Sequence, residues 1–287
     1  MLSEDFIDEN SCMVSVFACV FLTCSYVASL YVWKSPKNRD HPTTIKRRFF
    51  SVSCMMLFAP FITRLFLTEE NLNKGTFFEQ MGLRLSGLIM ATIFPLFLTV
   101  VLFMGPLSMQ YLSGLLKLYA EPVYWISNWQ DLVWVRNHIM APLSEEWVFR
   151  ACMMPLLLQC LDPLTAVFSG PLLFGIAHFH HMLEQIRGGL AIRTALMVSL
   201  FQFTYTSLFG AYSAYIFLRT GHFAASLVAH IFCNHMGFPN FSAVIYFPPL
   251  QRVLIVFCFL LGLGLWSIML VPITNPDIYD NRIYRVI

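Results

Sequence analysis

The sequence predicts an all-α, polytopic membrane protein: a helical bundle of about eight transmembrane helices with a water-accessible intramembrane cavity. Three observations support this fold class. Charged residues make up only 12% of the chain, whereas soluble domains carry about 25%. Hydrophobic residues make up 57%, the mean hydropathy is +0.66, and long apolar runs recur along the chain. Ionisable side chains interrupt the later runs, and such groups usually face a bundle interior or a water-filled cavity.

Eight apolar runs are the predicted spans, because a helix needs about 20 mostly apolar residues to cross a bilayer. They cover residues 12–33, 49–68, 85–108, 139–160, 163–182, 195–218, 221–237 and 251–272. Segment 114–138 mixes Trp and Tyr with scattered charges. It is predicted either as a helix lying at the membrane interface or as a connecting loop with aromatic anchors.

Basic residues predict the orientation, because cytoplasmic loops are enriched in Lys and Arg. The bias comes mostly from one loop, 34–48, which holds Lys34, Lys37, Arg39, Lys46, Arg47 and Arg48. With this loop in the cytosol, eight spans place both termini on the opposite side. The net charge of +2 is too small to indicate a nucleic-acid partner.

The cysteines are predicted to be small buried hydrophobic residues. Nearly all of them lie in apolar runs, and no C-x-x-C pair occurs. This distribution favours packing over a disulfide or zinc framework. The eight residues are Cys12, Cys19, Cys24, Cys54, Cys152, Cys160, Cys233 and Cys258.

The stretch "APLSEEWVFR", residues 141–150, places two glutamates and an arginine in a predicted span. Glu146 and Arg150 are four residues apart with the glutamate first, which predicts an ion pair within one helix. Glu145 points about 100° away around the helix and has no partner there. It is therefore the better candidate for a general base. Pro142 predicts that a helix begins just before it.

A second motif is "FGIAHFHH", residues 174–181. A lone histidine at a helix end is more often a capping or interfacial residue than a catalytic one. His178 is the deepest of the three histidines, and His180 and His181 are expected to reach water. His178 is thus the functional candidate here.

A third motif is "HIFCN", residues 230–234. His230 and Asn234 lie on one helix face, and an apolar helix has no packing reason to carry both. Cys233 borders the same face. It is predicted to be a packing residue, and a nucleophilic Cys–His pair is the alternative.

One carboxylate, two histidines and an amide side chain fit hydrolysis of an amide bond. Glu145 would take a proton from water, while His178, His230 and Asn234 hold that water or donate to the oxyanion. No metal is assigned. Two His and one Glu nevertheless match a catalytic zinc set, so a divalent metal such as zinc on Glu145, His178 and His230 is an alternative.

The rival class is a non-catalytic transporter or scaffold that uses the buried charges for ion passage or for structural pairing. A transport path should carry polar residues through the whole bilayer depth. The predicted topology instead concentrates them near the cytosolic side.

Three motifs in chain order resemble those of the CAAX-processing and bacteriocin-processing family of intramembrane proteases. They are E-E-x-x-x-R at Glu145, Glu146 and Arg150, F-x-x-x-H at Phe174 and His178, and H-x-x-x-N at His230 and Asn234. The contexts "FGIAHFHH" and "HIFCNHMGFP" resemble the eukaryotic branch, the type II CAAX prenyl proteases. The resemblance covers about residues 115–240.

This resemblance implies an eight-helix enzyme of the endoplasmic reticulum membrane, in contact with lipid and with its active site toward the cytosol. It implies removal of the last three residues of prenylated C-a-a-X proteins such as Ras-type small GTPases. The whole chain, 1–287, would be one protease domain with its motifs within 140–240. The family has been argued to use a glutamate, a metal or a cysteine.

By motif match, Glu145 would activate water, and His178, His230 and Asn234 would hold water or stabilise the oxyanion. Glu146 and Arg150 would be the neighbours of Glu145, with Arg150 reaching toward the carboxylate of the substrate.

Overall fold

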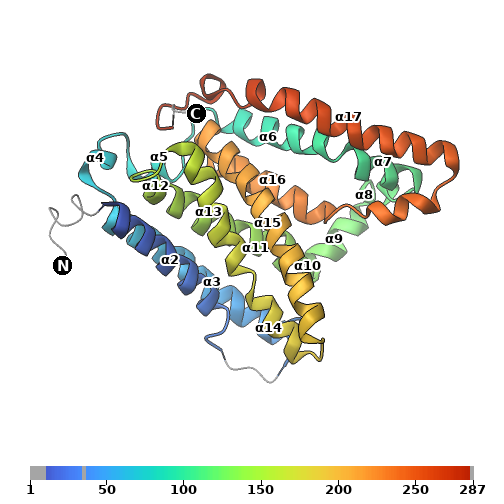
Figure 1. Cartoon of the computed structure of the whole chain (residues 1–287), viewed down its shortest axis with the longest axis horizontal. Coiled ribbons are helices and arrows are strands. Elements are labelled where there is room, and N and C mark those ends of the chain that lie inside the picture. The colour runs from blue at the N-terminus through green and yellow to red at the C-terminus, as the bar shows by residue number, and fades with distance from the viewer. Residues whose placement is uncertain (1–10, 34–36, 285–287) are drawn as a thin grey trace.

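Every regular element in the described part of the chain, residues 11–33 and 37–284, is a helix in the computed structural model (Figure 1). Lys34, which contributes to the predicted charge bias, lies outside these residues. In chain order the elements are α2 (Ser11–Ser29), α3 (Pro42–Phe66), α4 (Glu69–Leu72), α5 (Phe77–Gln80), α6 (Leu88–Leu102), α7 (Met104–Leu112), α8 (Leu116–Tyr119), α9 (Pro122–Gln130), α10 (Leu132–Val135), η1 (Arg136–Met140), α11 (Ala141–Glu146), η2 (Trp147–Cys152), α12 (Met153–Leu157), α13 (Pro163–Ala177), α14 (His180–Arg187), α15 (Ile192–Thr220), α16 (Phe223–Met236), η3 (Phe241–Tyr246), α17 (Pro249–Ile273) and η4 (Pro276–Tyr279).

The molecule is a polytopic helical membrane protein, and helices occupy each of the eight predicted ranges. By length and apolar composition, three helices of the described chain, α2, α3 and α17, qualify as spans. The pair α6 and α7 makes a fourth if it counts as one broken span. α16 is apolar but shorter. The count of eight spans therefore stays a prediction.

The predicted span 85–108 is not one straight helix. It breaks at Phe103 into α6 and α7, whose axes differ by 69°. The break precedes Gly105 and Pro106, and a proline removes a backbone donor and clashes with the carbonyl of the preceding turn. The predicted span 163–182 also divides, since α13 ends at Ala177 and His178 is its C-cap.

Two π-helical turns shape the segment that carries the glutamates. η1 precedes α11 and η2 follows it, so the helical path runs unbroken from Leu132 to Leu157. The α-helical segment α11 begins at Ala141, just before Pro142, as expected, but it continues the π turn η1 and is not the start of a separate helix. Pro142 follows the π turn directly, and π turns inside helices often mark functional sites.

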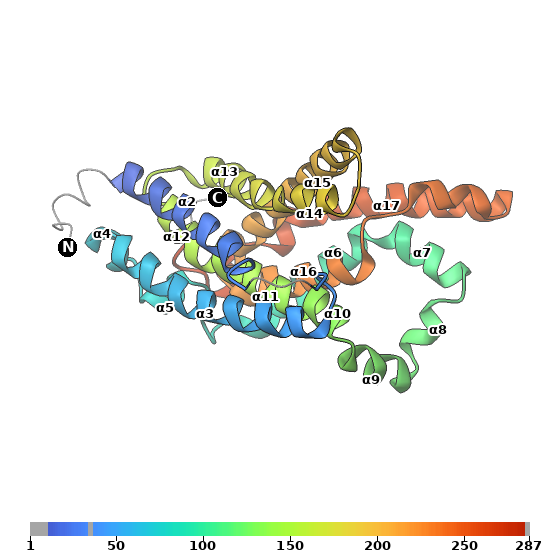
Figure 2. The same cartoon turned by 90° about the horizontal axis from the view of Figure 1, so that it is seen from below.

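The aromatic segment 114–138 forms short helices rather than one long interfacial helix. α8 and α9 arch away from the body between α7 and α10 (Figure 2). Tyr119 and Trp125 of the arch pack against His235 at the end of α16, with ring centroids 5.0 and 5.8 Å away. The arch is thus tied to the end of the helix that carries the third motif.

Local sequence signals place the helices that carry the second and third motifs. Asp162 is the N-cap of α13, its side chain accepts the Thr165 N–H, and Pro163 lies in the first turn. α16 ends at Met236 and is capped by Gly237, which has a φ of 67° that favours glycine. Asn234 therefore lies in the last turn of α16.

Cys12 and Cys160 correct the cysteine prediction. They form a disulfide between the start of α2 and the segment after α12, across 148 residues of sequence. Cys19 and Cys152 are buried as expected, whereas Cys24 and Cys54 are exposed on α2 and α3. The spacing of the cysteines in the sequence did not indicate this disulfide, because Cys12 and Cys160 become neighbours only after folding.

Loss of the disulfide is expected to lower the free energy of unfolding by about 2–4 kcal/mol. Cys160→Ser would lower the thermal midpoint in detergent, and Cys258→Ser, a free thiol on α17, is the matched control. Thiol titration of the unreduced, unfolded protein should find six free thiols among eight cysteines. A titre of eight would contradict the bond.

Candidate active site

A cavity of about 940 Å³ lies among the helices and contains the motif residues on its wall. This volume is near the upper end of the usual range for small-molecule sites. Glu145 from α11, His178 from the end of α13, and His230 and Asn234 from α16 all line it. The structure thus brings together side chains that lie up to 89 residues apart in the sequence.

The two adjacent glutamates have different surroundings. Glu146 is fully buried, and its Oε2 accepts from Arg150 Nε at 3.2 Å and from Ser213 Oγ at 2.7 Å. Glu145 lines the cavity, with 16% of its side chain exposed. Because a buried charge needs a partner and hydrogen bonds, Glu146 and Arg150 together form a structural ion pair. Glu145 is left facing the cavity.

His230 links the two glutamates. Its Nδ1 lies 2.6 Å from Glu146 Oε1, and its Nε2 lies 3.7 Å from Glu145 Oε2. The short contact requires a proton on Nδ1, since a carboxylate is an acceptor only. Glu146 therefore fixes the ring of His230 and directs its Nε2 toward Glu145 and the cavity.

Arg150 is turned away from the cavity. Its side chain is 2% exposed, it lies over the Phe174 ring at 4.6 Å, and its Nη2 donates to the Gly210 carbonyl at 3.4 Å. It does not belong to the described residues that line the cavity. A role for Arg150 in reaching the substrate carboxylate does not fit this placement.

Phe174 is buried between the charged groups and the histidines. Its ring packs edge-on against His178 at 4.7 Å and against His230 at 6.3 Å. Its carbonyl accepts from His178 Nδ1 at 2.8 Å, so the Nε2 of His178 is left as an acceptor. The motif F-x-x-x-H thus holds one histidine in a defined tautomer.

His180 and His181 also line the cavity, although they were expected simply to reach water. His181 pairs with Glu184 at 3.2 Å. The side chain of Asn234 donates to the backbone carbonyl of Asn137 at 2.8 Å, which ties α16 to η1.

Several residues that contribute to the site have no clear signal in the sequence. Ser213 is a small polar residue in the long helix α15, and only its hydrogen bond to Glu146 shows that it belongs to the site. Asn137 acts through its backbone carbonyl, which any residue supplies. Tyr26 lines the cavity and shares a hydrogen bond with Ser144 at 3.0 Å, from a helix more than 100 residues upstream.

The positions of the His, Cys and acidic side chains bear on the metal and thiol alternatives. Among the described residues, no group of three His, Cys, Asp or Glu side chains lies close enough to hold a metal ion. Cys233 lines the cavity. Both ring nitrogens of the neighbouring His230 already face carboxylates.

Gly210 is required where α15 crosses α13 beside the ion pair. A Cβ atom there would lie 2.8 Å from Pro171 Cβ, 3.2 Å from Arg150 Nη2 and 3.4 Å from Phe174 Cδ1. Gly210→Ala is expected to cost about 1–3 kcal/mol and to lower activity, because Pro171 must shift and Arg150 must give way beside it. Gly264→Ala, where a Cβ meets open space, is the control. Equal thermal midpoints for the two variants would contradict this packing.

The fold and the site define a class: a polytopic helical membrane protein with carboxylate, imidazole and amide side chains around an internal cavity. The family profile described as "Type II CAAX prenyl endopeptidase Rce1-like" matches residues 127–236. The human CAAX prenyl protease 2 is 45% identical over 278 residues, 94% of this chain and 84% of that protein. The Arabidopsis thaliana protein of the same name is 32% identical over 96% of this chain and 94% of its own length.

A more distant Saccharomyces cerevisiae CAAX prenyl protease 2 is 29% identical over 77% of this chain and 79% of that protein. No solved structure shows significant similarity to the chain. The chain belongs to the type II CAAX prenyl protease family and is a peptidase. The family that the three motifs indicated is confirmed.

Proposed function

We propose that this protein removes the C-terminal aaX tripeptide from prenylated CAAX proteins, Ras-type small GTPases among them, by attack of a water molecule that Glu145 activates. The observation that carries the proposal is the difference between the surroundings of Glu145 and those of Glu146. Glu145 is the acidic side chain that lines the cavity among the described residues, while Glu146 is held by Arg150, Ser213 and His230. The chain is proposed to act as a single protease domain.

The reaction needs one base, one acid and donors to the oxyanion. Glu145 takes a proton as the water oxygen attacks the carbonyl carbon of the prenylcysteine residue. It then gives this proton to the leaving nitrogen as the C–N bond breaks, which releases the tripeptide amine and a prenylcysteine carboxylate. His178, His230 and Asn234 line the same cavity. His178, whose Nε2 is an acceptor, is proposed to position the water, and His230 and Asn234 are proposed to position the water or to donate to the oxyanion.

The contacts of His230 favour this mechanism over the thiol. A thiolate nucleophile needs a base to take its proton, and both ring nitrogens of His230 face carboxylates. A divalent metal such as zinc on Glu145, His178 and His230 would require these side chains to rearrange first. Chelation therefore tests the metal alternative independently.

The apolar part of the cavity suits an isoprenoid chain. Phe103, Phe259 and Leu263 line it from the break between α6 and α7 and from α17. Burying an isoprenoid methylene or methyl group is worth about 0.8 kcal/mol. The prenyl group would therefore anchor the substrate in this part of the cavity, with its peptide directed toward Glu145.

The proposed location is the endoplasmic reticulum membrane, in contact with lipid, with the cavity open to the cytosol. Support comes from the basic loop, since Arg39 and Arg48 line the cavity. The disulfide lies at the other end of α2, where the opposite face would meet an oxidising lumen.

The test is tripeptide release from a farnesylated peptide ending in C-a-a-X by the purified protein in detergent. The same peptide without the farnesyl group is the control. We expect release only from the prenylated peptide. Absence of release from folded protein would contradict the proposed substrate and reaction.

A further inference from the structure

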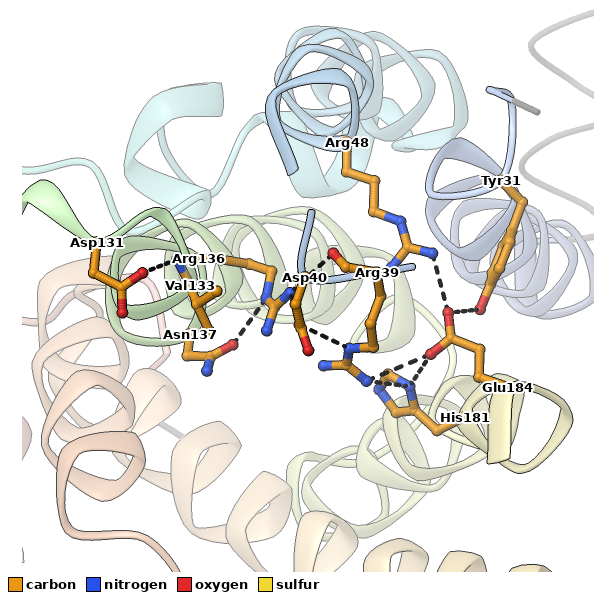
Figure 3. A network of polar contacts seen from close by, with 10 residues as sticks. All are labelled: Tyr31, Arg39, Asp40, Arg48, Asp131, Val133, Arg136, Asn137, His181 and Glu184. Atoms are coloured by element: carbon orange, nitrogen blue, oxygen red, sulfur yellow. Dashed lines mark hydrogen bonds and ion pairs between the residues drawn. The ribbon is translucent and has the colours of Figure 1, made fainter. Parts of the chain in front are cut away.

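Three arginines line the end of the cavity that is formed by the α2–α3 loop, the start of α3 and η1. They are Arg39, Arg48 and Arg136. Two carboxylates, Asp40 and Glu184, hold them in place without belonging to the described cavity wall (Figure 3). This group of five residues is called the arginine cluster below. Its three cations line the cavity, and its two anions pair with them.

The arginine cluster is a connected network. Arg136 Nη1 pairs with Asp40 at 2.7 Å, and Arg39 Nε lies 3.6 Å from the same carboxylate. Glu184 pairs with Arg48 at 3.0 Å and with Arg39 at 3.4 Å. Three guanidinium groups thus share two carboxylates, which leaves one positive charge in excess at the cavity wall.

Both carboxylates stay ionised at neutral pH. The hydrogen bond from Arg136 lowers the pKa of Asp40. Burial works to raise the pKa of Glu184, but hydrogen bonds from His181, Tyr31 and Arg48 outweigh it and hold that pKa well below its ordinary value. The excess charge is therefore a fixed property of the cluster over the working pH range.

The cluster keeps donors for a ligand. In the described part of the chain, the bonds of Arg136 engage its Nε and Nη1, and those of Arg39 engage its Nε and Nη1. Arg136 and Arg39 therefore each retain an Nη2 group, and planar guanidinium donors match the two oxygens of a carboxylate.

The cluster is joined to the proposed catalytic groups. Arg136 Nε donates to Asn137 Oδ1 at 2.9 Å, and the carbonyl of Asn137 accepts from Asn234 Nδ2 at 2.8 Å. Arg136 precedes Glu145 on one helical path by nine residues, roughly 13 Å at 1.5 Å per residue. Three extended residues span about 10 Å, so a tripeptide beginning at Glu145 ends within reach of the Arg136 side chain.

We propose that Arg39 and Arg136 bind the free C-terminal carboxylate of the substrate and so fix the distance from the chain end to the cleaved bond. The inference rests on the proposed function and adds a residue-level reason for release of a tripeptide. Figure 1 places α6 and α17 above α11, and α14, which carries Glu184, below it, so the peptide would run from the apolar part of the cavity to the cluster. Lipid phosphate is the competing anion, but these guanidinium groups line the cavity, and Arg136 has only 14% of its side chain exposed.

The test compares two farnesylated peptides that differ only at the end, one with a free carboxylate and one with a carboxamide. Wild-type enzyme is expected to cleave the carboxamide with a kcat/KM lower by about tenfold to a hundredfold, mainly through KM. In Arg136→Gln and Arg39→Gln the two peptides should be cleaved with kcat/KM values within about threefold of each other. Arg187→Gln, an exposed arginine at the end of α14, should keep the wild-type ratio.

Each outcome has one meaning. Equal cleavage of both peptides by wild type, or an unchanged ratio in both variants, would overturn carboxylate binding while leaving the protease function intact. Cleavage of neither peptide by wild type would instead refute the proposed function. If the arginines bind lipid phosphate instead, the variants would lose activity equally on both peptides. Added phosphatidylglycerol would then change the wild-type rates without changing the ratio of the two kcat/KM values. Because Arg39 has 43% of its side chain exposed, its variant keeps the test valid if Arg136→Gln fails to fold.

Discussion

Glu145→Gln is expected to lower kcat for tripeptide release by about 10²–10⁴-fold, the usual contribution of a positioned general base. Glutamine keeps the shape of the side chain but cannot take a proton from water. The side chain lines the cavity beside His230, so the substitution should leave packing intact. Single-turnover rates with a farnesylated peptide measure the loss, and the thermal midpoint in detergent serves as the control for folding.

A rate within about threefold of wild type, from protein with a normal thermal midpoint, would remove Glu145 as the base. Exposed Glu70, on α4, provides the matched substitution: Glu70→Gln should retain full activity. Comparable losses in both variants would indicate a preparation effect.

Arg150→Met is expected to destabilise the protein by about 3–5 kcal/mol, because it leaves the carboxylate of Glu146 buried without its cation. The double variant Arg150→Met/Glu146→Gln should recover most of this loss, since a neutral amide needs no counter-ion. Chemical unfolding in detergent of both single variants and the double variant measures the coupling between the two residues.

The control is a pair with the same spacing on the surface. Glu70 and Lys74 are also four residues apart, with side chains 86% and 50% exposed, and their charges are 4.0 Å apart. Their coupling should be no more than about 0.5 kcal/mol. A double variant no more stable than Arg150→Met would contradict the assignment of Glu146 and Arg150 as a structural pair.

The separation of the two glutamates was predictable because it depends on local geometry. Residues four apart meet on a helix and adjacent residues diverge, whatever the rest of the fold does. The same reasoning put His230 and Asn234 on one face of α16, and both line the cavity. The motifs were also sufficient to indicate the family.

Other features depend on hydrogen-bond register and on contacts distant in sequence. Hydropathy measures how apolar a segment is and does not report where a helix switches to π turns, as at η1 and η2, or bends, as at Phe103. The Cys12–Cys160 bond and the pairing of Arg136 with Asp40 join segments far apart in the sequence. No local pattern encodes such pairs, because their neighbours are set by the assembled bundle.

For a similar reason, the sequence did not predict that the Arg150 side chain points away from the cavity. Its pairing with Glu146 followed from spacing, but its contact with Phe174 and with the carbonyl of Gly210 depends on how α13 and α15 pack. Because Arg150 does not line the cavity, the proposed binding of the substrate's C-terminal carboxylate involves Arg39 and Arg136 instead.

The most direct measurement is the rate of tripeptide release by Cys233→Ala protein after exhaustive chelation, with a farnesylated C-a-a-X peptide as substrate. It removes the thiol and any loosely held metal while leaving Glu145, His178 and His230 in place. A water molecule activated by Glu145 predicts a rate within about threefold of the untreated wild type. Loss of activity that returns with the cysteine, or with added zinc, would contradict that mechanism.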